Sequence, residues 1–183
     1  MERTQAWEMV CAHLKSDNLK KHSLAVEAVM RALAARFGED IDLWGLAGLL
    51  HDIDYEETAE DFEKHGLLSL EILADAGIDG AVLYAISAHN PATGMVLETL
   101  LDKALYAADP VTGLMTAAAL VKPSKKLADV EVPSVLKKFK DKAFARGANR
   151  EQIDSCADFG MERADFLALS LAAMQPIAED LGL

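Results

Sequence analysis

Hydrophobic residues recur at intervals of three and four along almost the whole chain, and this spacing constrains the fold more than any other feature. Side chains three or four positions apart share one face of a helix, whereas a half-buried strand needs strict alternation. Stretches in which Val, Ile and Thr alternate with polar residues are absent. The sequence therefore predicts an all-α protein, a compact single-domain helical bundle without a β-sheet.

Capping residues and helix breakers indicate where these helices begin and end. Polar residues 16–18 can cap a long helix that runs to about residue 37 and is closed by Gly38. Proline is expected to break one helix at Pro110 and to kink or end the last one at Pro176, and the acidic stretch 52–63 is expected to be a loop. Further helices are expected over residues 5–14, 41–51, 64–76, 79–89, 94–109, 112–121, 134–146 and 164–181, with Asn149 capping one more.

A chain of 183 residues suits one domain, with a motif-bearing core over about 18–125 and C-terminal helices over 134–183 that pack on it. The longest uncharged apolar run, 43–50, is much shorter than a membrane span, and the N-terminus has no signal-peptide pattern. We therefore expect a cytoplasmic protein with no membrane partner, and a homo-oligomer is left open. Cys11 and Cys156 are expected to be buried free thiols.

The net charge of −12 argues against binding to long nucleic acids, so no partner of that kind is expected. Charge is uneven, however, because the segment 122–150 holds nine basic residues and three acidic ones. Such a segment indicates either a site for a small anion or a solvated helix face. Motifs for a P-loop, a dinucleotide-binding fold and a serine hydrolase are absent.

Ligand-type side chains occupy core positions on the predicted helices. His22 fills a gap in an apolar stripe, and an Asp shares a face with apolar residues near the end of another helix. A single inward histidine is usually a hydrogen-bonded core residue, but a buried acid is costly unless a cation pairs with it. His13, which lies off its stripe, is expected at the surface. The inward or helix-end ligands are His22, His51, Asp52, His65, His89 and Asp109, and together they favour a metal site.

The order of these residues resembles a known family. His22, then His51-Asp52 in LLHDID, then Asp109 in YAAD match the H…HD…D pattern of the HD-domain superfamily of metal-dependent phosphohydrolases, over about 18–125. The two further histidines, His65 in KHG and His89 in SAHN, look like the extra ligands of dinuclear members. The resemblance implies one ion held by the first four residues and a second held by the two further histidines, with Asp52 bridging. One or two divalent ions are expected, of manganese, iron or zinc.

The resemblance implies hydrolysis of a phosphoester or phosphoanhydride bond in a small phosphorylated metabolite or nucleotide by a metal-activated water. Asp52, the bridging ligand, would be a catalytic residue. Asp54 and Glu56 are candidates for the general acid or base, or else they are solvated loop acids. Where many relatives read HDIGK, this chain has Asp54 and Tyr55, and no GYP motif is present. That departure counts against a cyclic dinucleotide phosphodiesterase and removes the usual phosphate-binding lysine.

Cations from the basic segment are the candidates to replace that lysine, and Lys125 and Lys126 are the first choice because the turn before them could return them over the helix ends. The candidate substrate-binding residues are Lys122, Lys125, Lys126, Arg146 and Arg150. Thr112 is expected to add a small polar contact. Two other functions stay open, a di-iron oxygenase of the same superfamily and a non-catalytic sensor that binds metal or nucleotide.

Overall fold

The computed structural model describes residues 1–183 and contains helices, turns and no β-strand, which confirms the all-α prediction. The α-helices are α1 (Arg3–His13), α2 (Asp17–Phe37), α3 (Ile41–Leu50), α4 (Tyr55–Thr58), α5 (Leu67–Ile72), α6 (Gly80–Ala88), α7 (Leu100–Leu120), α8 (Val132–Phe139), α9 (Arg150–Asp154), α10 (Arg163–Met174) and α11 (Ala178–Leu181). Short 3₁₀ helices lie between them: η1 (Phe62–Lys64), η2 (Pro91–Thr93), η3 (Leu127–Asp129), η4 (Ser155–Phe159) and η5 (Gln175–Ile177).

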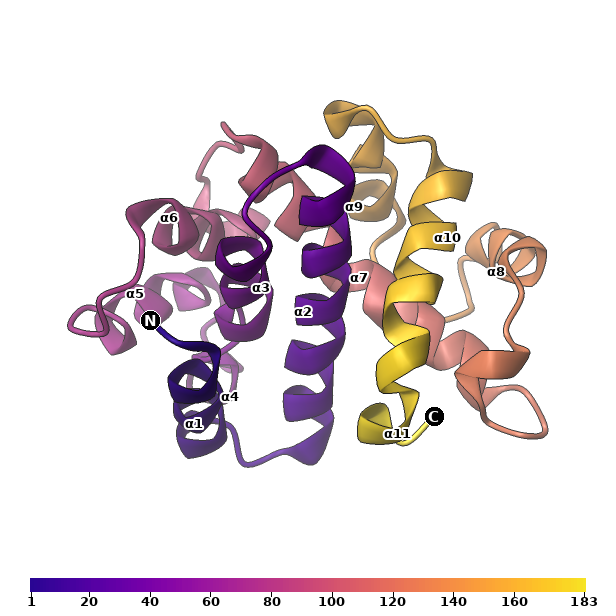
Figure 1. Ribbon diagram of the computed structural model, residues 1–183, viewed down its shortest axis with the longest axis horizontal. Helices are drawn as coiled ribbons and strands as arrows, with labels where there is room; N and C mark the ends of the chain where they lie inside the picture. The colour runs from indigo at the N-terminus through magenta and orange to yellow at the C-terminus, as the bar shows by residue number, and fades with distance from the viewer.

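Helix α2 lies at the centre of the molecule and packs against α3, α7 and α10 (Figure 1). Its buried residues follow the apolar stripe read from the sequence, and Gly38 ends it with φ 76°. The buried hydrophobic residues of the whole chain form one cluster, to which both the N-terminal helices and α10 contribute. The two termini lie on different sides of the molecule (Figure 1).

A glycine allows α2 and α3 to approach closely. A Cβ atom at Gly48 would lie 2.9 Å from the Cα atom of Glu27 and 2.9 Å from the carbonyl carbon of Val26, both in the backbone of α2. Because such a contact is too short for any side chain, only glycine fits here. The close approach brings His51, which follows α3, up to the face of α2 that carries His22.

Helix α7 continues through Pro110, and the expected break there is wrong. Thirteen of its residues are buried, on both sides of the proline, so the packing of the whole helix outweighs the loss of one backbone hydrogen bond. A capping box at Thr99 and Asp102 starts the helix six residues later than residue 94, the expected start. The residues after the proline therefore continue along the axis of the same helix, away from Asp109, and do not fold back over Asp109.

Four smaller expectations also differ from the structure. The stretch 52–63 contains α4 and part of η1, and α5 begins only at Leu67, so His65 precedes a helix instead of lying on one. Helix α8 ends at Phe139 and not at 146. Cys156 is buried as expected but Cys11 is exposed. The expected cap at Asn149 is confirmed, and the last long helix ends before Pro176.

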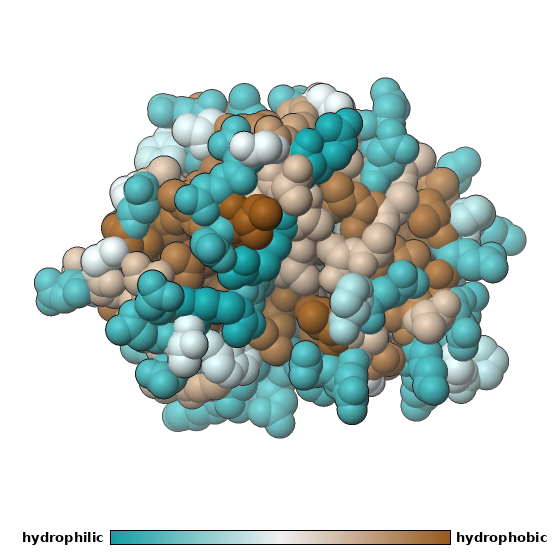
Figure 2. Space-filling view, viewed as in Figure 1, coloured by the Kyte–Doolittle hydropathy of each residue, from teal (hydrophilic) through white to brown (hydrophobic).

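Hydrophilic side chains project around the outline of the face in Figure 2, and hydrophobic ones show between them. Among the large apolar residues, only six are exposed, and one of them, Phe62, returns below because of its position. No helix combines the length and the apolar character that crossing a lipid bilayer requires.

Candidate metal centre

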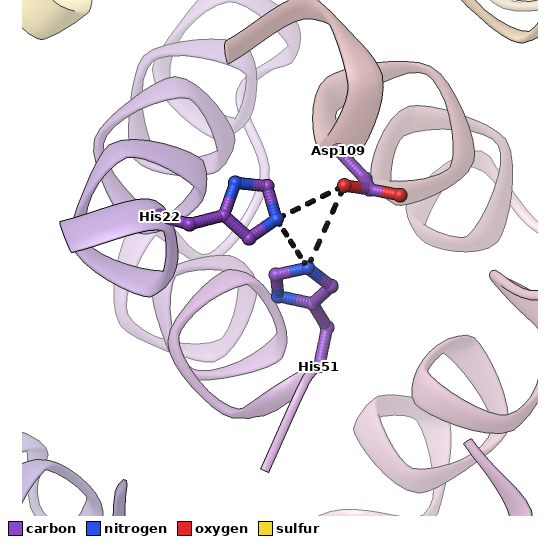
Figure 3. Close-up of side chains that lie close together, drawn as sticks. All are labelled: His22, His51 and Asp109. Carbon is purple, nitrogen blue, oxygen red and sulfur yellow. Dashed lines mark hydrogen bonds and ion pairs between the residues drawn. The ribbon is translucent and has the colours of Figure 1, made fainter. Parts of the chain in front are cut away.

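Six side chains from five parts of the chain converge at one point, and they are the six ligands expected from the sequence. In the first half of the cluster, the Nε2 atom of His22 on α2 lies 3.2 Å from Nε2 of His51 and 3.0 Å from Oδ1 of Asp109 on α7. Figure 3 shows these three side chains pointing toward one another. His51 is fully buried, whereas the other two are partly exposed.

Asp52 lies between this half and the second half. Its Oδ2 atom is 3.4 Å from Nε2 of His22, while its Oδ1 atom is 3.2 Å from Nε2 of His65 and 3.6 Å from Nε2 of His89. The last two imidazoles approach each other to 3.1 Å through their Nε2 atoms. The Oδ1 atom is also 3.3 Å from Nε2 of His51, so this one carboxylate contacts histidines of both halves, as a bridging ligand must.

All four imidazoles are oriented in the same way by their other nitrogen. The Nδ1 atoms of His51 and His89 donate to the backbone carbonyls of Gly48 and Ile86, at 2.8 and 2.5 Å. His65 donates from Nδ1 to Asp54, at 2.8 Å, and His22 to the hydroxyl of Thr112, at 3.1 Å, whose own proton goes to the carbonyl of Asp109. These acceptors assign the Nδ1–H form, so each Nε2 is left to bind in the centre.

The donor set fits one or two divalent transition-metal ions. Two atoms that each lie about 2.0–2.1 Å from one ion, at the angles of octahedral or tetrahedral geometry, are about 2.9–3.4 Å apart. The separations from His22 to His51, Asp52 and Asp109, and from His65 to Asp52 and His89, run from 3.0 to 3.4 Å. Nitrogen lone pairs that face each other at such distances repel unless a cation or a proton lies between them.

The charges of the cluster lead to the same conclusion. Burial alone would lower the pKa of His22, but its hydrogen bonds with Asp109 and Asp52 outweigh that effect and raise the pKa to about 10. His65 behaves likewise: burial is outweighed by Asp52 and Asp54, and its pKa rises to about 9. Burial would raise the pKa of Asp52 and Asp109, but the neighbouring histidines hold both well below the ordinary value. The centre therefore strongly favours positive charge.

The structure does not place Asp54 and Glu56 where a general acid or base would act. Asp54 is fully buried and accepts hydrogen bonds from His65 and from the backbone N–H groups of Gly66 and Ser69, so it orients a ligand and does not reach the cavity. Glu56 accepts from the N–H groups of Ser16 and Lys15, and these bonds hold its pKa below the ordinary value. It ties α4 to the start of α2.

A cavity of about 790 Å³ opens over the metal centre. Two of the expected substrate-binding residues, Arg146 and Arg150, line it, and so does Lys142, which was not among the candidates. The first choices, Lys125 and Lys126, do not line it, and neither does Lys122. All three follow the end of α7, and continuous helix carries that end roughly 16 Å from Asp109. That correction follows directly from the helix continuing through Pro110.

Arg150 organises the segment that presents the other two cations. Its guanidinium group donates to backbone carbonyls of five residues between Phe139 and Ala148, including Phe144 at 2.6 Å. Ala145, in the same segment, has φ 46°, which is rare for a residue with a side chain. Arg146 and Lys142 are exposed and take part in no ion pair, so their charges are available.

Four residues that belong to the site had no role predicted from the sequence. Tyr55, Phe62 and Asn90 line the cavity, and Lys142 adds charge to it. A signal existed only for the lysine, which lies within the basic segment four positions before Arg146. His13 stays outside the metal centre, as expected, but it is partly buried, 3.4 Å from Glu57.

The sequence of this chain is similar to known proteins. A family model described as HD domain matches residues 19–114. Ribonuclease Y of Desulfotalea psychrophila is 31% identical over 73% of this chain and 26% of its own length. Ribonuclease Y of Nitratidesulfovibrio vulgaris is 32% identical over 74% of this chain and 26% of its own length, and that of Clostridium perfringens is 33% identical over 62% and 23%. The chain spans about a quarter of the length of these relatives. No solved structure matches it.

These relatives contradict the expectation that long nucleic acids are excluded, because a ribonuclease acts on RNA. The net charge of −12 is a sum over the chain and does not describe the site, where Lys142 and Arg146 are unpaired. The family match covers more than half of the chain and contains all six converging ligands. The chain belongs to the HD domain family.

Proposed function

We propose that this protein is a metal-dependent phosphohydrolase that cleaves phosphodiester bonds in RNA. The observation that carries the proposal is the convergence of four Nε2 atoms and two carboxylates on one centre at the bottom of a cavity. Divalent ions in such a site supply the activation of a water molecule as nucleophile and the compensation of charge on the phosphoryl oxygens. The relatives named ribonuclease Y supply the choice of substrate class.

The ligands proposed for the ions are the six converging residues, divided as the sequence analysis expected. His22, His51, Asp52 and Asp109 would hold one ion, and His65 and His89 would hold a second together with Asp52. The protein's own contribution is to fix these groups before any ion binds. Buried acceptors hold each imidazole, so the centre needs little rearrangement to bind.

Lys142 and Arg146 take the part of the lysine that is missing after His51-Asp52. They lie in the lining of the same cavity as the metal ligands and have no carboxylate partner. A phosphate next to the cleaved bond would bind there, and arginine can hold it through two parallel hydrogen bonds. Arg150 is a positioning residue in this scheme, because its donors are already used by backbone carbonyls.

A second candidate is hydrolysis of a small nucleotide. It is favoured by the volume of the cavity, about 790 Å³, which is in the range of small-molecule pockets. The acidic protein as a whole would also repel a long polyanion away from the site. Both candidates share one metal centre and the attack of water on phosphorus. They differ in the bond cleaved, which is a phosphodiester in RNA and a phosphomonoester or phosphoanhydride in a small nucleotide.

The test uses purified protein loaded in turn with manganese, iron or zinc. It measures cleavage of a fluorescently labelled single-stranded oligoribonucleotide, and phosphate release from mononucleotides. Asp52→Asn should abolish turnover, whereas His13→Gln, a histidine change outside the centre, should not. Turnover of mononucleotides alone would favour the second candidate. Oxygen uptake by the iron form without phosphate chemistry would favour an oxygenase, and tight nucleotide binding without turnover would favour a sensor; either result contradicts the proposal.

A further inference from the structure

An exposed aromatic ring stands at the edge of the cavity. Phe62 lines the cavity and keeps 49% of its surface exposed, and it is one of only six exposed large apolar residues of the protein. Its ring lies against the imidazole of the metal ligand His65, with the centroids 5.2 Å apart and the planes tilted by 30°. The imidazole therefore packs against one face of the ring, while the side chain as a whole remains accessible.

The backbone that carries this ring is held rigidly. Asn90 is 2% exposed, and its side-chain amide donates to the carbonyls of Phe62, at 2.7 Å, and His65, at 3.0 Å. Its oxygen accepts from the N–H group of Ala92, so both the nitrogen and the oxygen of the amide are engaged in hydrogen bonds. Residues 62 and 65 are thus fixed by one buried side chain, which orders the ring and the metal ligand together.

The other chemistry in the same lining is cationic. Lys142 and Arg146 stand unpaired in the cavity, and the metal centre lies at its bottom. A ligand that satisfies all three features must present a flat aromatic face, a phosphate for the metal centre and a further negative charge. A nucleotide unit within a single strand has these three parts, because its base can stack and its neighbouring phosphates are charged.

We propose that Phe62 is the stacking platform for the base of the nucleotide bound at the metal centre, and that it determines specificity for single-stranded substrates with an accessible base. The inference rests on the proposed function for the presence of a nucleotide. It adds the residue that reads the base, and it assigns the strand's neighbouring phosphate to Arg146 and Lys142. In a duplex the stacked neighbouring base pairs cover the faces that Phe62 needs, so a duplex should bind poorly.

The test is a binding cycle on uncleaved RNA. Affinity is measured by fluorescence anisotropy in the Asp52→Asn background, for a single-stranded oligoribonucleotide and for the same strand with one abasic position. Phe62→Leu should weaken binding of the intact strand by roughly 5- to 100-fold, the effect of losing one stacked base. Phe62→Trp should restore it. Removing the base should weaken the parent protein by a similar factor and should not weaken Phe62→Leu further.

Val96→Ala is the matched control, because Val96 is also an exposed apolar residue, at 67%, but does not line the cavity. Equal affinities of the parent and Phe62→Leu proteins, or an abasic loss of equal size in both, would overturn the platform. The same variants in the active protein separate the two proposals. Turnover with an unchanged KM in Phe62→Leu would support the proposed function and contradict the stacking role of Phe62. The expected binding cycle in a protein that hydrolyses nothing would support the stacking role and contradict the proposed function.

Discussion

Asp54 holds His65, one of the six proposed metal ligands, through a hydrogen bond of 2.8 Å from Nδ1 to Oδ1, and both side chains are buried. Its second oxygen accepts from the N–H groups of Gly66 and Ser69, which follow in the next turn. Burial would raise the pKa of this carboxyl, but the bonds from His65 and from the two N–H groups outweigh burial and lower it. One ionised carboxylate therefore fixes a ligand and the start of α5 together.

Asp54→Asn should disturb both the orientation of His65 and the start of α5. The amide NH₂ group must face either His65 or the two backbone N–H groups, so donor opposes donor at one of these positions. We expect a loss of about 1–3 kcal/mol in the free energy of unfolding and about a 10- to 100-fold loss in metal affinity. Thermal unfolding and metal content per chain are the measurements.

Glu63→Gln is the control for that change, since Glu63 is an exposed acid nearby with no hydrogen bond or ion pair. It should keep the parent's stability and metal content. If Asp54→Asn binds two ions per chain as tightly as the parent does, the orienting role of Asp54 is wrong.

Features that depend on local spacing could be predicted from the sequence, and features that depend on packing between distant segments could not. Periodicity was enough for the all-α fold and for the inward position of His22, because a helix converts spacing into direction. It could not show whether α7 would survive Pro110, since that depends on burial by other helices. Because a helix break was expected at Pro110, the basic residues were assigned to the wrong places. Lys125 and Lys126 were expected over the site, and Lys142 was overlooked.

The orienting contacts were equally out of reach of sequence patterns. Asp54 was expected to be a general acid or base, or else a solvated loop acid, but its role comes from contacts made 11 to 15 positions later. Asn90 likewise acts on carbonyls more than 20 positions earlier. Such long-range hydrogen bonds leave no local spacing to detect.

Gly48→Ala should separate α2 from α3. The added methyl group would lie 2.9 Å from backbone atoms of Glu27 and Val26, which cannot move as a flexible side chain could. Overpacking of this kind costs about 1–3 kcal/mol, or a fall in Tm of about 2–12 °C. Gly113→Ala on α7 is the matched control, because no atom lies within 4 Å of its added methyl group. It should raise Tm slightly by favouring helix; a Gly48→Ala protein as stable as the parent would contradict the close approach.

Metal affinity should rise steeply with pH. Without an ion, His22 and His65 hold protons up to pKa values of about 10 and about 9, so an ion must displace both. Apparent affinity for zinc should therefore increase by up to about 100-fold per pH unit between pH 6 and pH 8.5. Calorimetry in buffers of different ionisation enthalpy should count about two protons released per chain. A flat profile over this range would mean that the two imidazoles are already neutral.

The metal-free protein should show the opposite trend in stability. The folded-state pKa of each of these histidines is raised above the unfolded value near 6.5, so their stabilising contribution is complete below about pH 6.5. It is lost as the pH rises through about 9 and 10. The Tm of the metal-free protein should fall over this range while the increase in Tm on adding metal grows, and His22→Gln should weaken both trends.

Arg150→Lys should affect substrate binding more than the chemical step. Arg150 donates to carbonyls of five residues between Phe139 and Ala148, and a lysine ammonium has only three donors at a single point. The segment that presents Arg146 and Lys142 should loosen, while the six metal ligands keep their places. We expect KM for an oligoribonucleotide to rise several-fold with kcat and metal content nearly unchanged, and limited proteolysis to cut within 140–149. Arg146→Lys keeps the charge and the segment, and should raise KM without new cleavage; a fall in kcat with unchanged KM in Arg150→Lys would place that arginine in the chemistry itself.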